Sequence, residues 1–455
     1  GLYCHGRCRG SSVTGRIMIN RHVWQRWWRL KRYLNIANLP AHDVACPCCG
    51  IQVSLPPLGQ AQRADCPQCG ELLVRIQSNP FVAPLAFVTA GWILMFLVGT
   101  QFYLGMDMMG VVSEHLSLVD VFDNLRRHEY GFLATVMLLL VFFTPVLFLS
   151  MFMYVHIALY QQLNLPFLNT ITRHMIRLKP WLMVDVFFIA TLVAIVKIAA
   201  ISEVSFGPAF VLIFAYAVIL IHMGQMVNPH WLFYQLAKLD PEHKVFEHIT
   251  NKHHCISCTR CLYDQPAAQD ECDICGASLY KRRPYSIQQS LAVLIAACIL
   301  FIPSNLYTMM RTESLTADIQ SNVIDGIFIL WSENDRLVAV IIFVASLMIP
   351  VAKIIMMAIL LYSAKYKLLL PAKILSKMYH FVEFIGRWSM IDIFVIIILM
   401  AMYRTNVAQV TPGLASIYFT FVVFATMVSA ELLDIRLIWD KQRQPEVAGE
   451  QHEQA

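Results

Sequence analysis

Charged residues are scarce in this chain of 455 residues. They make up 14% of it, whereas soluble globular proteins usually carry about a quarter. This scarcity excludes an ordinary water-soluble globular protein. The hydrophobic share of 58% and the mean hydropathy of +0.57 indicate a membrane protein instead.

Two sequence signals are also absent. No Walker motif (G-x-x-x-x-G-K-[ST]) occurs, so we do not expect ATP hydrolysis as an energy source. The first ~40 residues lack an apolar region with a small-residue cleavage site, so we expect no secretory signal peptide. They carry the basic aromatic run RHVWQRWWRLKRYL at 21–34, which either lies on an anionic membrane surface or is a frayed polar tail.

Long apolar runs are abundant, by contrast. About 18 or more consecutive apolar residues mark a candidate transmembrane helix. Eight segments meet or approach this length, at roughly 82–104, 131–159, 181–201, 204–227, 287–310, 337–362, 388–403 and 406–430. The chain is therefore expected to cross the membrane eight times.

The loops between these segments differ in charge, and an excess of Lys and Arg marks the cytoplasmic side. Loop 161–180 holds three basic residues and no acid, loop 363–387 holds five against one acid, and segment 281–283 reads KRR. Loops 107–130 and 311–336 each hold five acids and two bases. The charge pattern therefore predicts that both termini face the cytoplasm.

The two halves of the chain resemble each other. Residues 115–145 align without a gap with 320–350 at an offset of 205, which pairs Pro145 with Pro350 inside their spans. At offset 207, Trp181, Met183, Asp185 and Phe187 match Trp388, Met390, Asp392 and Phe394. Each half has four spans with both ends inside, so we expect parallel repeats about a pseudo-twofold axis along the membrane normal. Each proline removes a backbone hydrogen bond and is expected to kink its helix.

Most of the thirteen cysteines are spaced for metal binding. They form Cys46-x2-Cys49-x16-Cys66-x2-Cys69 and, before the second half, Cys258-x2-Cys261-x10-Cys272-x2-Cys275. Paired Cys-x-x-Cys knuckles make a closed Cys4 site without catalytic function, and zinc is favoured over rubredoxin-like iron. Gly50, Gly70 and Gly276 follow their knuckles, where a tight turn needs glycine. Cys255 competes with Cys258 as a first ligand.

Ionisable residues inside apolar spans are costly and therefore suggest function. Asp185 and Asp392 each lie four residues after the Trp that opens their span, so about 6 Å from its start. Lys353 lies roughly 14 Å deep, near the midplane. We expect Lys353 to pair with Asp392, because their spans are adjacent and the lysine can reach across the difference in depth.

Hydroxyl residues share helix faces with these charges. Ser346 is seven residues before Lys353, Ser389 is three before Asp392, and Thr426 lies in the eighth span. These residues either complete a functional polar network or provide ordinary hydrogen bonds between helices.

The two halves differ at the deepest charge. The first half has Phe148 where the second has Lys353, so one working polar site is more plausible than two. Lys197 and Arg404 match at offset 207 but lie at the outer ends of their spans, where we expect them to reach the membrane surface.

These features together resemble the paraquat-inducible protein A family, which includes PqiA and LetA. The resemblance covers about residues 42 to 440 and rests on the two Cys4 ribbons, each followed by four spans. It also rests on YSIQQSLAVLIAACILFIPSNLY (285–307), LWSENDRLVAVIIFVASLMIPVAK (330–353) and VEFIGRWSMIDIFVI (382–396), and the second half fits PqiA more closely than LetA. The N-terminal ~40 residues and the shorter loop of the second ribbon depart from the family pattern.

The resemblance implies a protein of the bacterial inner membrane that works with a hexameric periplasmic MCE-domain tunnel. The implied task is moving or loading phospholipids between the inner membrane and that tunnel, with no nucleic-acid partner. It also implies tetraspanin-like four-helix units. By position, the family's polar site would fall on Asp185, Ser346, Lys353, Ser389, Asp392 and Thr426.

The sequence thus predicts an all-α polytopic membrane protein of two tandem four-helix repeats, each preceded by a small cytoplasmic Cys4 zinc ribbon. The expected units are a basic tail (1–41), ribbon 1 (42–78), membrane domain 1 (79–230), a linker with ribbon 2 (231–284), membrane domain 2 (285–440) and a polar tail (441–455). The first functional hypothesis is lipid transport that is coupled to a change in protonation inside the membrane. Two other hypotheses compete with it: a scaffold that only anchors the tunnel, and a redox or metal sensor that uses the spare thiols Cys48 and Cys255.

Overall fold

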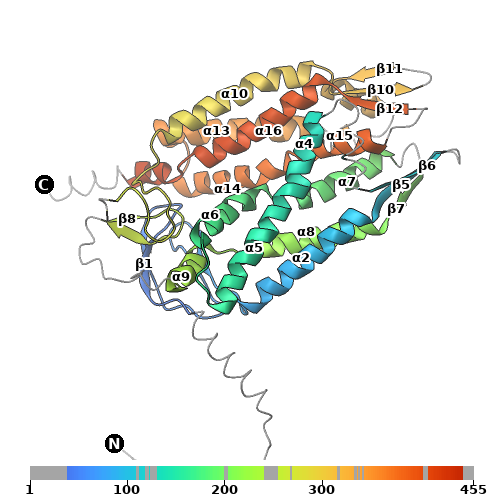
Figure 1. Ribbon diagram of the computed structural model, residues 1–455. Helices are drawn as coiled ribbons and strands as arrows, with labels where there is room; N and C mark the ends of the chain where they lie inside the picture. The colour runs from blue at the N-terminus through green and yellow to red at the C-terminus, as the bar shows by residue number, and fades with distance from the viewer. Residues whose placement is uncertain are drawn as a thin grey trace, which may run out of the picture.

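The computed structural model describes a bundle of long helices with small strand pairs at one end and two larger strand groups at the other (Figure 1). The described residues are 38–108, 112–117, 122, 131–198, 203–239, 255–266, 269–314, 318–332, 336, 339–340, 343–402 and 408–443. The N-terminal basic run, the C-terminal tail and Arg404 therefore lie outside them, as does the side chain of Lys197.

The cysteine-rich segments form short antiparallel hairpins. In the first, β1 (His42–Ala45) pairs with β2 (Gln52–Leu55), and β3 (Arg63–Asp65) pairs with β4 (Leu72–Arg75). In the second, β8 (Cys255–Ser257) pairs with β9 (Asp264–Pro266). Both segments lie at the same end of the helix bundle (Figure 1).

Eight described helical runs are long and apolar enough to cross a membrane, as predicted. In the first half, the first run is α2 (Val82–Thr100) and the fourth is α8 (Pro208–Met226). The second run consists of α4 (Gly131–Met137), η1 (Leu138–Phe143) and α5 (Thr144–Gln161). The third consists of α6 (Leu168–Leu178), η2 (Lys179–Trp181) and α7 (Val184–Ile198). A short helix, α9 (Pro229–Leu239), follows them.

The helices of the second half follow in the same order. They are α10 (Ser286–Leu306), then η4 (Phe343–Met348) with α13 (Ile349–Lys365), then α14 (Ala372–Trp388) with α15 (Ile391–Met402), and finally α16 (Leu414–Leu432). A short helix, α11 (Val323–Ser332), precedes η4. The third and seventh runs are thus each built from an entry helix, α6 or α14, and a more apolar helix, α7 or α15, that continues it.

The all-α prediction is wrong at the end of the bundle opposite the ribbons, where two three-stranded sheets lie. There β5 (Phe102–Met108), β6 (Val112–Ser117) and β7 (Glu203–Phe206) form one sheet in the order β6-β5-β7. A second sheet has the order β11-β10-β12, from β10 (Met310–Ser314), β11 (Asp318–Ser321) and β12 (Ala408–Pro412). The apolar run predicted to be helical to 104 becomes a strand after Thr100, because hydropathy alone does not separate short apolar strands from helix ends.

The two membrane prolines follow segments of wider helix. Pro145 comes two residues after the π-helix η1, and Pro350 comes two residues after the π-helix η4. A proline leaves the carbonyl one turn earlier without its amide donor, and a π-turn adjusts the helix around that position. The π-helices lie next to both prolines, and the predicted kink of the helices stays a prediction.

The two halves contact each other through their third membrane helices. The rings of Phe187 on α7 and Phe394 on α15 meet edge to face with centroids 5.5 Å apart. These two residues are equivalent at offset 207 in the sequence. Within the halves, α2 packs against α8 and α10 against α16.

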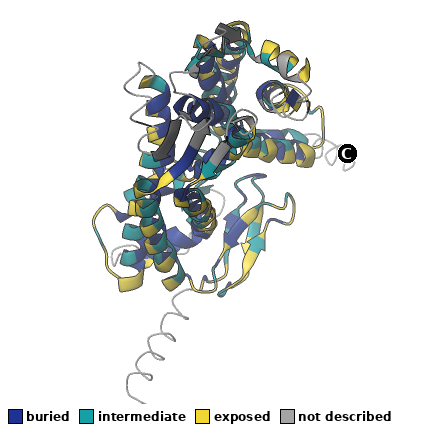
Figure 2. Cartoon of the chain, turned by 90° about the vertical axis from the view of Figure 1, so that its right-hand side faces the viewer, coloured by how far each residue is buried: buried dark blue, intermediate teal, exposed yellow. Residues whose placement is uncertain are grey.

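Apolar side chains also cover the outside of the bundle. Phe96, Val211 and Ile299 are 72%, 67% and 63% exposed. Seen from the strand end, exposed residues lie on the outer sides of the helices and buried residues between them (Figure 2). An apolar exterior of this kind is stable in lipid, where helices satisfy their own backbone hydrogen bonds. The chain is therefore a multi-pass membrane protein.

Candidate functional site

The eight predicted cysteine ligands come together as two groups of four. In ribbon 1 the sulfur atoms of Cys46 and Cys69 are 3.5 Å apart, and those of Cys49 and Cys66 are 3.6 Å apart. In ribbon 2 the corresponding distances are 3.5 Å for both Cys258–Cys275 and Cys261–Cys272. Within each group all four sulfur atoms lie within 4.8 Å of one another. Four thiolates at this spacing fit a tetrahedral metal ion, in which the sulfurs surround the metal at about 2.3 Å.

The knuckle turns explain the glycines. Gly50, Gly70 and Gly276 have φ values of +71°, +77° and +61°, in the left-handed region that glycine adopts without steric cost. Their amides donate to Cys46, Cys66 and Cys272 across the turn. The third knuckle has Leu262 at this position, with φ of +62°, so one turn uses a residue that sequence reasoning would not choose.

The choice of first ligand in ribbon 2 is also settled. Cys258 belongs to the four-sulfur group, whereas Cys255 lies outside it in β8. The spacing Cys258-x2-Cys261 therefore defines the first knuckle, as the family pattern favours.

Lys353 is buried in the middle of the second half. It is 1% exposed on α13, and its ammonium donates to Thr426 Oγ1 at 2.8 Å and to Ser389 Oγ at 3.4 Å. The hydroxyl of Thr426, on α16, donates a hydrogen bond to the carbonyl of Val423 at 2.9 Å. Three of the six predicted network residues thus form one connected group that joins three helical segments.

The ammonium of Lys353 contacts the hydroxyl groups of Ser389 and Thr426. Its predicted ion pair with Asp392 stays a prediction. Asp392 lies in the first turn of α15, three residues after Ser389. Ser346, 5% exposed, lies in the π-helix η4 that precedes α13.

Asp185, the second predicted acid, has a different partner. Arg387 Nη2, at the end of α14, lies 3.0 Å and 2.9 Å from the two carboxylate oxygens of Asp185 and 2.7 Å from the Leu182 carbonyl. The ion pair crosses between the halves, which sequence reasoning missed because it compared residues within each half. Phe148, the counterpart of Lys353, is fully buried.

A pocket of about 370 Å³ opens beside this ion pair. Its lining combines the end of the first-half entry segment with α14 and α16 and includes Lys179, Glu383, Arg387 and Glu431. Apolar residues such as Met427 line the rest. The seam between the halves therefore holds a mixed polar and apolar cavity next to the Asp185 carboxylate.

Each ribbon contacts an entry helix of the other half. In ribbon 1, Cys48 Sγ lies 3.7 Å from Ser376 Oγ on α14. In ribbon 2, the Gly276 carbonyl accepts a hydrogen bond from Arg173 on α6. The two ribbons meet where the ring of His42 stacks on that of Tyr263 with centroids 5.5 Å apart. His42 also stacks on His230 of α9, with centroids 4.9 Å apart.

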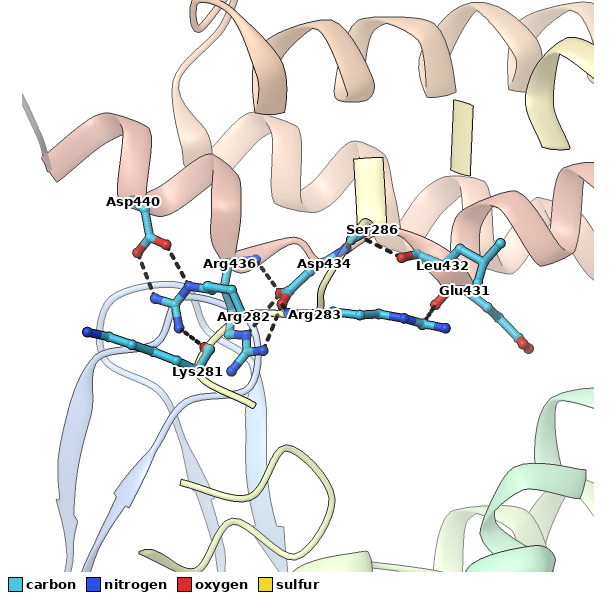
Figure 3. A network of polar contacts seen from close by, with 9 residues as sticks. All are labelled: Lys281, Arg282, Arg283, Ser286, Glu431, Leu432, Asp434, Arg436 and Asp440. Atoms are coloured by element: carbon cyan, nitrogen blue, oxygen red, sulfur yellow. Dashed lines mark hydrogen bonds and ion pairs between the residues drawn. The ribbon is translucent and has the colours of Figure 1, made fainter. Parts of the chain in front are cut away.

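A second set of contacts ties ribbon 2 to the C-terminal segment (Figure 3). Arg282 donates to both carboxylate oxygens of Asp440 at 2.6 Å and 2.7 Å. Asp434 accepts from Arg436 at 2.9 Å and 2.7 Å and from the Arg283 amide at 3.1 Å. Charge-assisted pairs with this geometry hold the ribbon in a fixed position relative to α16.

Cys48 also belongs to a third group of side chains that could hold a metal ion. Its sulfur, a Glu71 oxygen and a His380 ring nitrogen lie within 4.8 Å of one another. Glu71 Oε2 and His380 Nε2 are 3.0 Å apart. The group was not predicted, since its members are far apart in the sequence and only Cys48 stood out as a spare thiol.

Comparisons with known proteins place these features in a family. The family described as Paraquat-inducible protein A matches residues 82–237 and 287–443. The chain is 32% identical to "Intermembrane transport protein PqiA" of Escherichia coli strain K12 over 410 residues, covering 89% of this chain and 97% of that protein.

Two further relatives are more distant. "Lipophilic envelope-spanning tunnel protein A" of the same strain is 27% identical, with 88% of this chain and 92% of the relative covered. "Probable intermembrane transport protein" of Haemophilus influenzae is 25% identical, with 88% and 96% covered. No solved structure matches the chain. These relatives are named for transport rather than catalysis, and the chain belongs to the paraquat-inducible protein A family.

Proposed function

We propose that this protein is the inner-membrane component of an intermembrane lipid transport system. In this proposal it moves or loads phospholipids between the inner membrane and a periplasmic tunnel formed by an MCE-domain hexamer. The names of its relatives, which refer to intermembrane transport and an envelope-spanning tunnel, support the general role. The ribbons and both termini would face the cytoplasm, as the charges of the loops predict.

The observation that carries the proposal is the burial of Lys353 among hydroxyl groups within the membrane helices. A lysine that is 1% exposed there is costly, and such residues commonly serve transport pathways. Its hydrogen bonds to Thr426 and Ser389 join α13, α16 and the start of the α15 segment. A change in the charge of this lysine would alter both hydrogen bonds together.

The transport step would combine this group with the seam between the halves. Asp392, Ser346 and Asp185 complete the proposed polar network. Because Asp185 is paired with Arg387 across the seam, this ion pair would hold one of two arrangements of the halves. The pocket of about 370 Å³ beside it offers apolar walls and charged groups to an amphipathic ligand.

Zinc is the metal we propose for both Cys4 groups. The thiolate donors and their distances fit Zn²⁺, which favours closed tetrahedral sulfur sites. The metal would stabilise the ribbons, and no transport step needs to pass through it. The matching strand orders of the two sheets also support the proposed tandem repeats. The domain boundaries given above are part of the same proposal.

A scaffold function is the second candidate, and one observation favours it. The contact between Lys353 and Thr426 joins α13 to α16, as an ordinary hydrogen bond between membrane helices would. In that case the protein would only anchor the tunnel.

The first test uses Asp392→Asn, which keeps the side-chain shape and removes the charge. The protein is reconstituted in vesicles with its tunnel partner, and transfer of a fluorescent phospholipid is measured. We expect at least a tenfold loss of transfer with normal insertion, because the proposed polar network loses its carboxylate. Wild-type transfer by Asp392→Asn would refute a transport role for this residue.

A further inference from the structure

A second pocket, of about 460 Å³, lies where ribbon 2 meets the entry helix α6 of the first half. Four arginines and one histidine line it: Arg173, His174, Arg177, Arg260 and Arg283. The remaining lining residues, such as Thr259, Ser278 and Tyr280, carry hydroxyl groups or are small, and none has a carboxylate. The pocket therefore concentrates positive charge.

The charge is only partly compensated by neighbouring groups. Arg173 and Arg283 donate to the backbone carbonyls of Gly276 and Glu431, which are neutral acceptors. The Asp434 carboxylate is already held by Arg436, as Figure 3 shows. Within the described part of the chain, Arg177 and Arg260 form no ion pair or hydrogen bond, although Glu431 acts electrostatically on Arg177 and Cys275 on Arg260. Their guanidinium donors therefore remain available for hydrogen bonds.

One alternative explanation is that these arginines only balance the negative charge of a metal-bound Cys4 group. The first ribbon argues against it. Arg443 donates to the Cys49 carbonyl in ribbon 1, but at offset 207 the positions of His174 and Arg177 correspond to Phe381 and Phe384. A Cys4 ribbon in this protein thus forms without arginines at these two positions.

The surroundings suggest the kind of ligand. Phe167 and Tyr285 precede α6 and α10 at the ribbon end of the bundle and are 79% and 71% exposed. Aromatic side chains at this level commonly sit among lipid headgroups, where basic residues meet phosphate. Guanidinium groups bind phosphate oxygens in pairs of hydrogen bonds.

We propose that this pocket between α6 and ribbon 2 binds a phosphate group, supplied by an anionic lipid headgroup or by free phosphate. Arg177 and Arg260 would bind the phosphate oxygens directly, while Arg173 and Arg283 hold the walls of the pocket in place. This site is separate from the Lys353 group, and it does not depend on whether the protein transfers lipid.

The test uses the full-length protein in detergent. Binding of inorganic phosphate and of short-chain phosphatidylglycerol is measured by native mass spectrometry for wild type, Arg177→Gln and Arg177→Gln/Arg260→Gln. The matched control is Arg63→Gln/Lys281→Gln, which also removes two exposed positive charges from the ribbon region but none from the pocket. Zinc content is measured in parallel.

We expect wild type and control to bind, and the double variant to bind at least tenfold more weakly with unchanged zinc content. Tighter binding of phosphatidylglycerol than of phosphate would identify the headgroup as the source, and the reverse would identify free phosphate. The proposal is overturned if wild type binds neither, or if Arg177→Gln and the double variant bind as well as the control. If the double variant loses zinc, its weaker binding no longer reports on the pocket, and Arg177→Gln becomes the deciding variant. Full phosphate binding by Arg177→Gln would then also overturn the proposal.

Discussion

At the scale of single residues, the equivalent acids of the two halves have different surroundings. Asp185 is bound by Arg387 from the opposite half, whereas Asp392 follows the serine that contacts Lys353. The sequence showed that both acids were embedded and that Lys353 lacked a counterpart. It did not show the Arg387 contact, because the register between two packed helices from different halves is set by tertiary packing.

Replacing Arg387 with Gln tests the contact across the seam. The side chains of Arg387 and Asp185 are 32% and 24% exposed, so water screens the pair in part. We expect a loss of about 1–2 kcal/mol in stability, since the carboxylate loses its charged partner. The measurement is the thermal midpoint of the detergent-solubilised protein.

Asp185→Asn/Arg387→Gln serves as the control for this prediction. If the two side chains interact, the double variant should lose less stability than the sum of the two single losses. Additive losses would mean that each side chain acts through other contacts.

At the scale of elements, the number of membrane helices follows from hydropathy, and their ends do not. Apolar residues continue past Thr100 to Leu104, yet they belong to β5 because β6 and β7 provide hydrogen-bond partners. Such long-range pairing leaves no local signal in the sequence. The Cys4 groups were predictable, because their ligands lie within about 25 residues of one another and chelation dictates the spacing.

His230, in the first turn of α9, contacts both ribbons. His230 is 1% exposed, bonds the Cys261 carbonyl through Nδ1, and meets His42 Nε2 at 2.7 Å through Nε2. Burial lowers the pKa of His230 to about 3, although the carbonyl contact acts in the opposite direction. The neutral ring is therefore the form that the folded protein accommodates.

This burial predicts a pH dependence of stability. The unfolded chain takes up the proton below the ordinary pKa of about 6.5, so stability is complete above that pH and decreases as pH falls towards 3. Between pH 7.5 and 5.5 wild type should lose about 1.4 kcal/mol more than His230→Gln. Thermal midpoints at the two pH values measure this, and equal pH slopes in both proteins would contradict the assignment.

At the scale of the whole molecule, the two halves meet through equivalent helices, and each ribbon also contacts a helix of the opposite half. This exchange makes the ribbons part of the contact between the halves. A movement of one half relative to the other would therefore change the contacts of both ribbons and the shape of the pocket beside Arg387. The repeat was visible in the sequence, but the crossed docking was not, since it depends on how the repeats pack.

The measurement that tests the account most directly compares Lys353→Met with Phe148→Met. Both place methionine at equivalent buried positions of the two halves, and only the first removes the buried charge. For each protein, phospholipid transfer in vesicles with the tunnel partner and the thermal midpoint are measured on the same preparation. Replacing a buried charged side chain by an apolar one of similar size is often neutral or stabilising.

If the Lys353 group carries transport, Lys353→Met loses at least tenfold of the transfer rate while its thermal midpoint stays equal or rises, and Phe148→Met keeps most of its transfer. Wild-type transfer by Lys353→Met would contradict the account. So would a loss of transfer matched by a fall in thermal midpoint, which is the result that a scaffold predicts.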